Sequence, residues 1–187
     1  MNQIFTQVCR AIDNLMNDHP RVTVAIDGNC TAGKTTLAGL LQQHYDCNVI
    51  HMDDFFLRPE QRTPDRFAQP GGNVDYERFL EEVLLPLRED VPFSFRPFDC
   101  SAFTLAQPLT VRPKALTIIE GTYSHHPHFS DPYDLKIFLG VTPEVQRRRV
   151  LERPAFLHQR FFDDWIPMEE TYFQVFRIPE QADLIFR

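Results

Sequence analysis

The chain has 187 residues, 43% of them hydrophobic and 24% charged, which is the balance of an ordinary globular protein. Its formal net charge of −7 argues against a nucleic-acid-binding protein, because such a protein needs a basic surface stripe. No apolar run is long enough to cross a bilayer, and the first residues lack the layout of a signal peptide, so we expect a cytoplasmic protein that binds no membrane. The scattered cysteines form no CxxC pair and are expected to be reduced thiols: Cys9, Cys30, Cys47 and Cys100.

The N-terminal part of the chain alternates between helical and strand patterns. Apolar residues at helical spacing predict a helix over 3–17, and the β-rich run 22–26 predicts a buried strand. A glycine-containing loop over 28–35 leads into a second predicted helix over 34–45. Residues 48–52 are predicted to form a second strand.

The middle of the chain contains the least regular segments. Residues 57–74 hold several prolines, glycines and arginines, and such a long loop in a compact domain is expected to be functional or mobile. A helix is predicted over 79–87. Residues 91–113 combine prolines with short β-type pieces and are expected to form a hairpin beside the main sheet. Apolar runs then predict strands over 115–119 and 135–139.

The C-terminal part completes the pattern. Residues 143–152 and the aromatic stripe within 161–176 are predicted to be helical, and 183–186 to form a last strand. Because strands and helices alternate throughout 1–187, we expect one α/β domain. Its predicted architecture is a three-layer sandwich with a mostly parallel five-stranded sheet and helices on both faces.

One loop carries a specific chemical signal. Residues 28–35 read GNCTAGKT and match the phosphate-binding pattern GxxxxGK[ST] at every fixed position. Gly28 and Gly33 permit backbone angles that side chains forbid, so successive N–H groups can form an anion nest at the start of a helix. We expect Lys34 to reach the β- and γ-phosphates and the Thr35 hydroxyl to bind Mg²⁺. The predicted nucleotide-binding residues are Gly28, Asn29, Cys30, Thr31, Ala32, Gly33, Lys34, Thr35 and Thr36.

The loop predicts nucleotide binding without selecting a reaction, because GTPases, ATPases and kinases share it. The chain lacks the guanine-selective N-K-x-D tetrad, and motor-type ATPases are usually longer. A small-molecule kinase therefore fits the chain best. A nucleotide-binding regulatory module and a nucleotide hydrolase stay as alternatives.

Acidic residues follow two predicted strands, with Asp53 and Asp54 after one and Glu120 after the other. Ligands of a parallel sheet bind at the carboxyl ends of its strands. A kinase needs one carboxylate for the acceptor hydroxyl and another for the magnesium shell. Because neighbouring residues of an extended chain point to opposite sides, only one of Asp53 and Asp54 is expected to face the γ-phosphate, and the pattern leaves the choice open.

Three segments together resemble the uridine kinase and phosphoribulokinase group of P-loop kinases: 24–38, 51–56 with the sequence HMDDFF, and 119–121 with the sequence IEG. The resemblance implies a P-loop NTPase fold with ATP and Mg²⁺ as cofactors. It selects Asp53 as the catalytic base near the metal, and it assigns Glu120 to the metal and the acceptor. The metal ligands expected in this way are Thr35, Asp53 and Glu120.

The resemblance also implies an acceptor pocket and a lid. Residues 97–100, with Arg96 before them, are similar to a pocket-lining hairpin of uridine kinases, so Arg96, Phe98 and Asp99 are expected to contact the acceptor. The segment 147–160 is similar to the lid. The catalytic residues expected are Asp53, Lys34 and two lid arginines, Arg149 and Arg153, whose guanidinium groups suit phosphate.

The acceptor itself is the most open part of the prediction. By analogy it is a nucleoside such as uridine or cytidine, with pantothenate, another riboside or a sugar phosphate as alternatives. His125 is expected to contact the acceptor, whereas the histidines near it lack the spaced partners of a zinc site. The expected partner is a small molecule, and homo-oligomer formation stays open.

Overall fold

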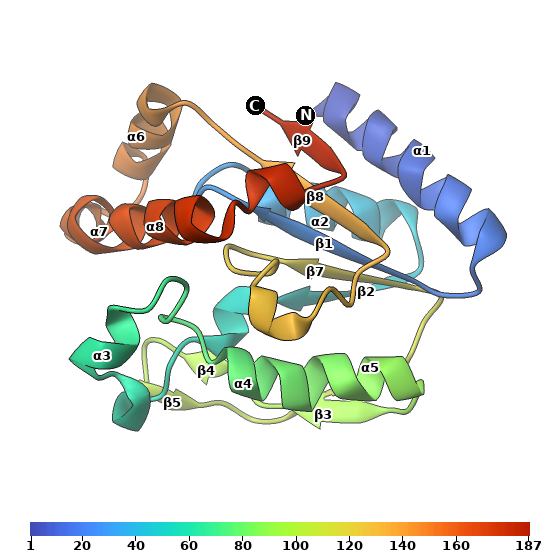
Figure 1. Cartoon of the computed structure of the whole chain (residues 1–187), viewed down its shortest axis with the longest axis horizontal. Helices are drawn as coiled ribbons and strands as arrows, with labels where there is room; N and C mark the ends of the chain where they lie inside the picture. The colour runs from blue at the N-terminus through green and yellow to red at the C-terminus, as the bar shows by residue number, and fades with distance from the viewer.

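The computed structural model describes residues 1–187 and contains a five-stranded sheet in which all neighbouring strands are parallel. Figure 1 shows this sheet at the centre of the molecule. In spatial order its strands are β2 (Cys47–His51), β7 (Leu116–Glu120), β1 (Val22–Gly28), β8 (Leu135–Leu139) and β9 (Leu184–Phe186). The predicted α/β fold with a five-stranded parallel sheet is confirmed.

Helical elements occupy most of the remaining chain, as predicted, although several are single turns. In chain order they are α1 (Asn2–Asp18), α2 (Lys34–His44), η1 (Met52–Phe55), η2 (Pro59–Gln61), α3 (Pro64–Phe67), α4 (Tyr76–Phe79), η3 (Leu80–Leu84), α5 (Leu85–Glu89), η4 (Pro127–Phe129), α6 (Pro143–Leu151), α7 (Ala155–Arg160), η5 (Phe161–Trp165), α8 (Ile166–Phe176) and η6 (Pro179–Gln181). No helix combines the length and apolar character that crossing a bilayer requires.

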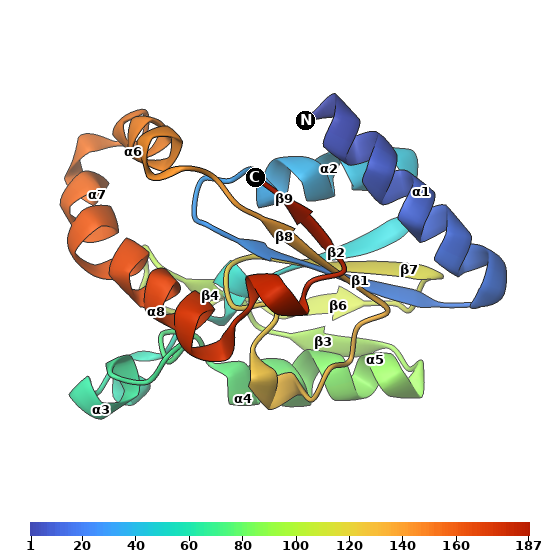
Figure 2. The ribbon, with the colours of Figure 1, turned by 45° about the horizontal axis from the view of Figure 1, so that its top comes forward.

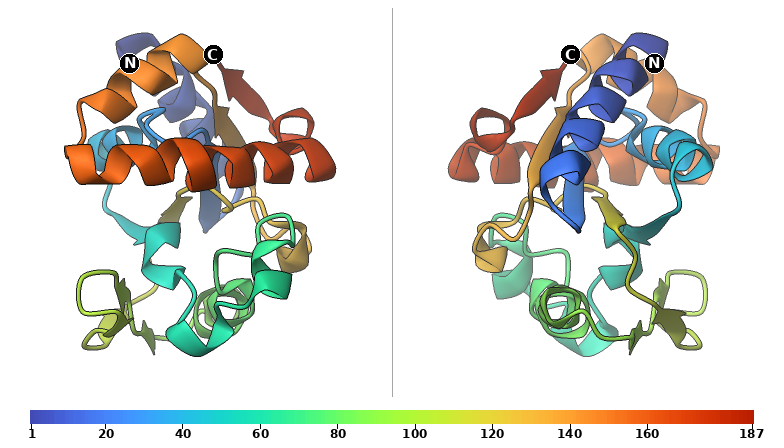
Figure 3. Two further views of the ribbon diagram at one scale, coloured as in Figure 1. Left: turned by 90° about the vertical axis from the view of Figure 1, so that its left-hand side faces the viewer. Right: turned by 90° about the vertical axis from the view of Figure 1, so that its right-hand side faces the viewer.

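The two faces of the sheet bury separate hydrophobic cores, and helices cover both (Figure 3). On one face, α1 and α2 pack against β1, where Ile12 and Leu37 join a cluster with Val24. On the other face, α4, η3 and α8 pack against the sheet, and Phe79 and Tyr172 are fully buried. Neighbouring residues of β7 therefore enter different cores, Ile118 one and Ile119 the other, as the period of a strand requires.

Two long helices each contain a π-helical turn just before a proline. The turn η3 lies between α4 and α5, which has Pro86 in its first turn, and η5 lies between α7 and α8, which has Pro167 there. A proline lacks the N–H donor, and its ring clashes with the carbonyl group four residues earlier. A π-turn is one of the local adjustments that accommodate a proline, so these helices continue where a regular one would kink.

The predicted hairpin region 91–113 forms two small antiparallel ladders outside the main sheet (Figure 2). They pair β3 (Phe93–Phe95) with β6 (Leu109–Val111), and β4 (Phe98–Asp99) with β5 (Thr104–Leu105). The hairpin prediction is thus correct.

The segment 57–74 contains the short helical elements η2 and α3 and is anchored by one arginine. The Arg66 guanidinium donates to the carbonyl groups of Gly72 and Val74 at 2.9 and 2.8 Å, and it pairs with the Glu77 carboxylate at 2.6 Å. The segment therefore has its own internal structure. Its mobility stays a prediction.

His126 is a buried histidine between two helices, only 7% exposed. Its ring stacks on Tyr76 of α4 with centroids 4.3 Å apart, and it lies parallel to Tyr172 of α8 at 6.0 Å. Burial lowers the pKa of His126 from 6.5 to about 4. The native protein therefore holds this imidazole neutral at a pH where the unfolded chain protonates it.

We expect this histidine to make the native state less stable in mild acid. Between pH 6.5 and about 4 the unfolded state binds a proton that the native state excludes, so the free energy of unfolding falls as the pH falls. Relative to a His126→Phe variant, the wild type should lose ~2 kcal/mol between about pH 7 and pH 5, measured by urea unfolding. Identical pH slopes in the two proteins would contradict this assignment.

Candidate active site

The glycine loop joins β1 to α2, as its motif predicts. Gly28 has a φ of 137°, and a Cβ atom at this position would lie 1.9 Å from the Leu139 carbonyl oxygen on the neighbouring strand β8. Gly33 has a φ of 102° and caps the N-terminus of α2. Both glycines are therefore required by the backbone, and the loop directs its N–H groups toward the start of a helix.

Lys34 follows the loop and is only 7% exposed. Its ammonium group donates to the carbonyl oxygens of Gly28 and Asn29 at 2.8 and 2.9 Å and to the Thr122 hydroxyl at 3.0 Å. None of these partners is a carboxylate. The positive charge is thus held at the loop without a salt bridge, which suits a phosphate ligand.

The strand-end acid Glu120 lies beside the loop. Its carboxylate accepts a hydrogen bond from the Thr35 hydroxyl at 3.1 Å, and the other carboxylate oxygen lies 3.2 Å from the same hydroxyl. His51 Nδ1 is also 2.5 Å from Oε1 of this carboxylate, because His51 and Glu120 are register partners on β2 and β7. The hydrogen bond to Glu120 raises the pKa of His51. Sequence reasoning did not select His51, although it directly precedes the acidic turn.

Asp53 and Asp54 lie on the turn η1 that follows β2. Asp53 is accessible to solvent, but desolvation by the surrounding protein raises the pKa of its carboxyl group. Lys34 opposes this rise, and Glu120 adds to it. Burial likewise raises the pKa of Asp54, with His51 opposing the rise. The strand order thus brings Asp53, Lys34 and Glu120 within electrostatic reach of one another.

The lid-like segment 147–160 covers the end of α6, a short connection and α7. Arg149 donates to the Thr31 carbonyl oxygen at 2.8 Å, so it contacts the glycine loop. Arg153 is exposed, and its positive charge opposes the rise in the pKa of Asp53 that burial causes. The structure therefore brings both arginines to the loop and the acidic turn. Their contact with phosphate stays a prediction.

Asp27 lies next to the glycine loop and was not selected by sequence reasoning. It is fully buried, and its carboxylate accepts hydrogen bonds from the backbone N–H groups of Gly28 at 2.7 Å, Tyr123 at 3.2 Å and His125 at 2.9 Å. The Tyr172 hydroxyl of α8 donates a fourth at 2.8 Å. An acid inside an apolar strand run, directly before the glycine loop, was the available signal.

Glu169 is a second missed residue. It lies on α8, is 2% exposed, and accepts hydrogen bonds from the Cys30 backbone N–H at 2.9 Å and from Gln146 at 2.6 Å. Burial raises the pKa of Cys30 to about 12, and the charge of Glu169 adds to this rise, so the Cys30 thiol is not a reactive nucleophile. No sequence pattern marked Glu169, because it falls within a stripe that reads as core.

The expected acceptor contacts lie in the hairpin region or in the core. Arg96 donates to the carbonyl oxygens of Leu105 and Ala106 on the returning strand of the hairpin. Asp99 accepts two backbone hydrogen bonds within its own turn, and these lower its pKa. These contacts assign structural roles to Arg96 and Asp99.

Phe98 and His125 are both buried, but they differ in their surroundings. Phe98 is 5% exposed and packs against Phe103 at the end of the hairpin. His125 is 6% exposed, and its Nε2 atom lies 3.3 Å from the Ala25 carbonyl oxygen in the core beneath the sheet edge. This placement gives no support to an acceptor contact by His125, because its ring is directed into the core.

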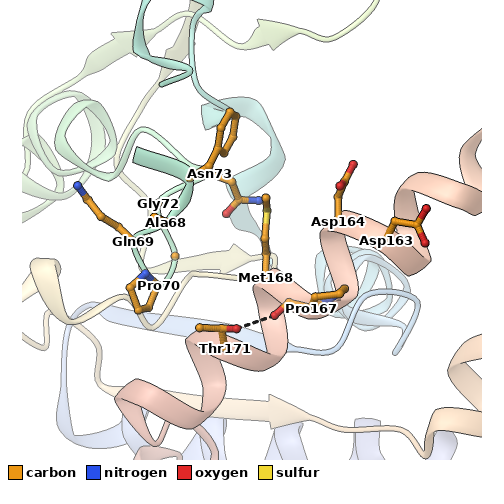
Figure 4. Close-up of a pocket in the computed structure, with 12 residues that line it drawn as sticks. Ala68, Gln69, Pro70, Gly72, Asn73, Asp163, Asp164, Pro167, Met168 and Thr171 are labelled. Carbon is orange, nitrogen blue, oxygen red and sulfur yellow. Dashed lines mark hydrogen bonds between the residues drawn. The ribbon is translucent and has the colours of Figure 1, made fainter. Parts of the chain in front are cut away.

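A separate cavity of about 230 Å³ lies between the segment 67–73 and the helix formed by η5 and α8 (Figure 4). Asn73 and Met168 approach each other from its two sides, and Asp163 and Asp164 line one end. The glycine loop is not among its lining residues.

Three solved structures share this fold at low sequence identity. A candidate uridine kinase from Bacillus stearothermophilus has a TM-score of 0.68 at 19% identity, over 97% of this chain and 100% of that one. A candidate fructose transport system kinase from a Silicibacter species has a TM-score of 0.61 at 23% identity, over 90% of each chain. D-glycerate 3-kinase from Cryptococcus neoformans has a TM-score of 0.68 at 15% identity, over 90% of this chain and 88% of that one.

No protein-family model matches the chain, and no curated protein matches its sequence. The fold is nevertheless that of the P-loop kinases, as the three structures show. The resemblance to uridine kinase-like proteins that the motifs indicated is thus confirmed at the level of the fold.

We expect Asp27→Asn to destabilise the protein. The side-chain NH₂ group of asparagine is a donor, and it would face N–H or O–H donors that the carboxylate of Asp27 accepts from in the native protein. The free energy of unfolding should fall by about 2–4 kcal/mol, measured by urea denaturation. Asp134→Asn is the matched control: Asp134 is exposed and accepts one backbone hydrogen bond from Thr23, so the loss should be about 1 kcal/mol or less. Equal losses in the two variants would argue against a special role for Asp27.

Proposed function

We propose that the protein is an ATP- and magnesium-dependent kinase that transfers the γ-phosphoryl group to a hydroxyl group of a small molecule. One observation carries the proposal: Lys34, Glu120 and Asp53, from three different segments, meet at the carboxyl edge of the sheet. This arrangement joins a phosphate-binding loop to an acid–base group, and phosphoryl transfer requires both.

The residues present fit a magnesium ion. Thr35 and Glu120 offer oxygen donors, the type that Mg²⁺ prefers, on adjacent elements. The protein has no cluster of three or more His, Cys, Asp or Glu side chains suited to a metal, so phosphate oxygens and water would complete the coordination. When bound, the ion would neutralise charge on the phosphate oxygens. His51 would help to hold the Glu120 carboxylate in place through its contact with Oε1.

Asp53 would act as the general base. As the acceptor oxygen bonds to the γ-phosphorus, its proton would pass to the Asp53 carboxylate, and the bond from that phosphorus to the bridging oxygen of ADP would break. Burial raises the pKa of Asp53, which makes its carboxylate a stronger base, and Lys34 limits the rise. Arg153 would add positive charge near the transferring group, and Arg149 would act from the glycine loop.

The acceptor is a separate question. Uridine and cytidine are the acceptors that the resemblance favours. The three similar structures carry names with three different acceptors, so the fold by itself selects none. We propose a small-molecule alcohol as the acceptor class, with nucleosides tested first beside pantothenate, other ribosides and sugar phosphates.

We expect both Lys34→Ala and Asp53→Asn to abolish acceptor-stimulated ADP release, with a loss of roughly 10²–10⁴-fold for the missing base. Asp53→Asn should still bind ATP, because the loop and Lys34 are unchanged. Steady-state ADP release and isothermal titration with ATP check the two expectations.

Asp54→Asn is the matched control, because it removes the neighbouring carboxylate while leaving the proposed base in place. Asp53→Asn with wild-type turnover would reject Asp53 as the base. Tight ATP binding without any acceptor response in the wild type would favour the regulatory module, and phosphate release without an acceptor would favour a hydrolase.

A further inference from the structure

The segment 57–74 contains three arginines, and one of them, Arg62, does not pair with a carboxylate. Arg58 lies 3.4 Å from carboxylate oxygens of Glu60 and Asp75, and Arg66 forms a close pair with Glu77. Arg62 has no carboxylate within 4.0 Å. Two of the three guanidinium groups are thus neutralised within the segment, whereas the third is not.

Arg62 is nevertheless held in place. Its Nε atom donates to the Leu57 carbonyl oxygen at 2.9 Å, and its guanidinium carbon lies 4.5 Å from the ring centre of Phe103 and 5.4 Å from that of Phe98. The Nη1 and Nη2 groups make no hydrogen bond within the protein. The half-buried guanidinium group of Arg62 is thus held by a backbone carbonyl group and two aromatic rings. Its Nη1 and Nη2 donors have no acceptor within the protein.

The electrostatic surroundings of Arg62 point to the same conclusion. Burial lowers the pKa of Arg62, and the positive charge of Arg160 on α7 lowers it further. A second cation thus lies within electrostatic reach. Arg160 itself has only a long contact of 4.0 Å with Asp164, and both side chains of that pair are more than half exposed.

The hairpin end also connects Arg62 to the proposed base. Cys100 lies between Phe98 and Phe103 in the chain, and burial raises the pKa of its thiol. The charge of Arg62 opposes this rise, while the charge of Asp53 adds to it. Arg62 and Asp53 therefore both lie within electrostatic reach of Cys100 at the hairpin end.

We infer that the acceptor carries an anionic group, a carboxylate or a phosphate, which the Nη1 and Nη2 atoms of Arg62 bind on the Phe98–Phe103 platform. The inference rests on the proposed kinase function and specifies its substrate class. The anion would be fixed at the hairpin while the acceptor hydroxyl is directed to Asp53. Among the candidate acceptors, pantothenate and sugar phosphates have such a group, whereas uridine, cytidine and other neutral ribosides do not.

The test compares ADP release with five acceptors: pantothenate, D-glycerate, ribose 5-phosphate, uridine and cytidine. We expect an anionic compound to stimulate the wild type and the neutral nucleosides to have no effect. Arg62→Gln should raise KM for that compound about 10–100-fold, with kcat and KM for ATP changed less than about threefold. Arg62→Lys should recover part of the loss. Arg10→Gln, at an exposed position on α1, is the matched control and should match the wild type.

A second measurement does not depend on turnover. The rate at which iodoacetamide alkylates Cys100, followed by peptide mass spectrometry, should fall when the anionic compound binds to the wild type and should not change in Arg62→Gln. Stimulation of the wild type and Arg62→Gln alike by uridine or cytidine would overturn the anion site and leave the kinase intact. Protection of Cys100 without ADP release would support the anion site and reject the kinase. If neither readout responds to any of the five compounds, both proposals fall.

Discussion

The buried carboxylate of Asp27 is the interaction on which the arrangement of the site depends. It links the end of β1 to the loop after β7 through two backbone N–H groups, and to α8 through the Tyr172 hydroxyl. It also fixes the first residue of the glycine loop through the Gly28 N–H. Because a buried carboxylate is tolerated only when its oxygens are satisfied, these elements must keep their mutual positions in the native state. The hydrogen bonds of Asp27 thus fix the glycine loop together with the loop after β7 and with α8.

The charges around the loop are incompletely balanced in a way that suits a phosphate ligand. Lys34 has only neutral oxygen partners, and Arg149 is bonded to a carbonyl group. Beside the loop, the negative charge of Glu120 adds to the raised pKa of Asp53. A nucleotide with its metal ion would bring negative charge to the cations and positive charge to the acids. Preorganised groups of this kind can stabilise developing charge without first reorganising.

The strands, the glycine loop and the convergence of Asp53 with Glu120 could be predicted because local patterns and the parallel-sheet rule determine them together. The roles of Asp27 and Glu169 could not be predicted, because their partners come from distant segments. The acid before the glycine loop stands out in its apolar run, but Tyr172, which bonds to it, is 145 positions away. The acceptor contacts of Arg96 and Asp99 stay a prediction. Both residues fit a pocket motif, and in the fold part of each side chain bonds to nearby backbone groups. Sequence alone also gave no way to separate Arg62 from its neighbouring arginines, because only the folded chain determines which of them meet carboxylates.

The helix that runs through α7, η5 and α8 is anchored at one end only. Glu169 and Tyr172 hold α8 to the glycine loop and to the core, whereas no residue of α7 is buried. Between the two lies η5, where a wider helical turn precedes Pro167. A regular helix would behave as a rigid rod from end to end and would pull on the loop whenever its tip moved. The wide turn interrupts the regular hydrogen-bond pattern of the helix, so the contacts of Glu169 and Tyr172 fix α8, whereas the direction of α7 is set at η5.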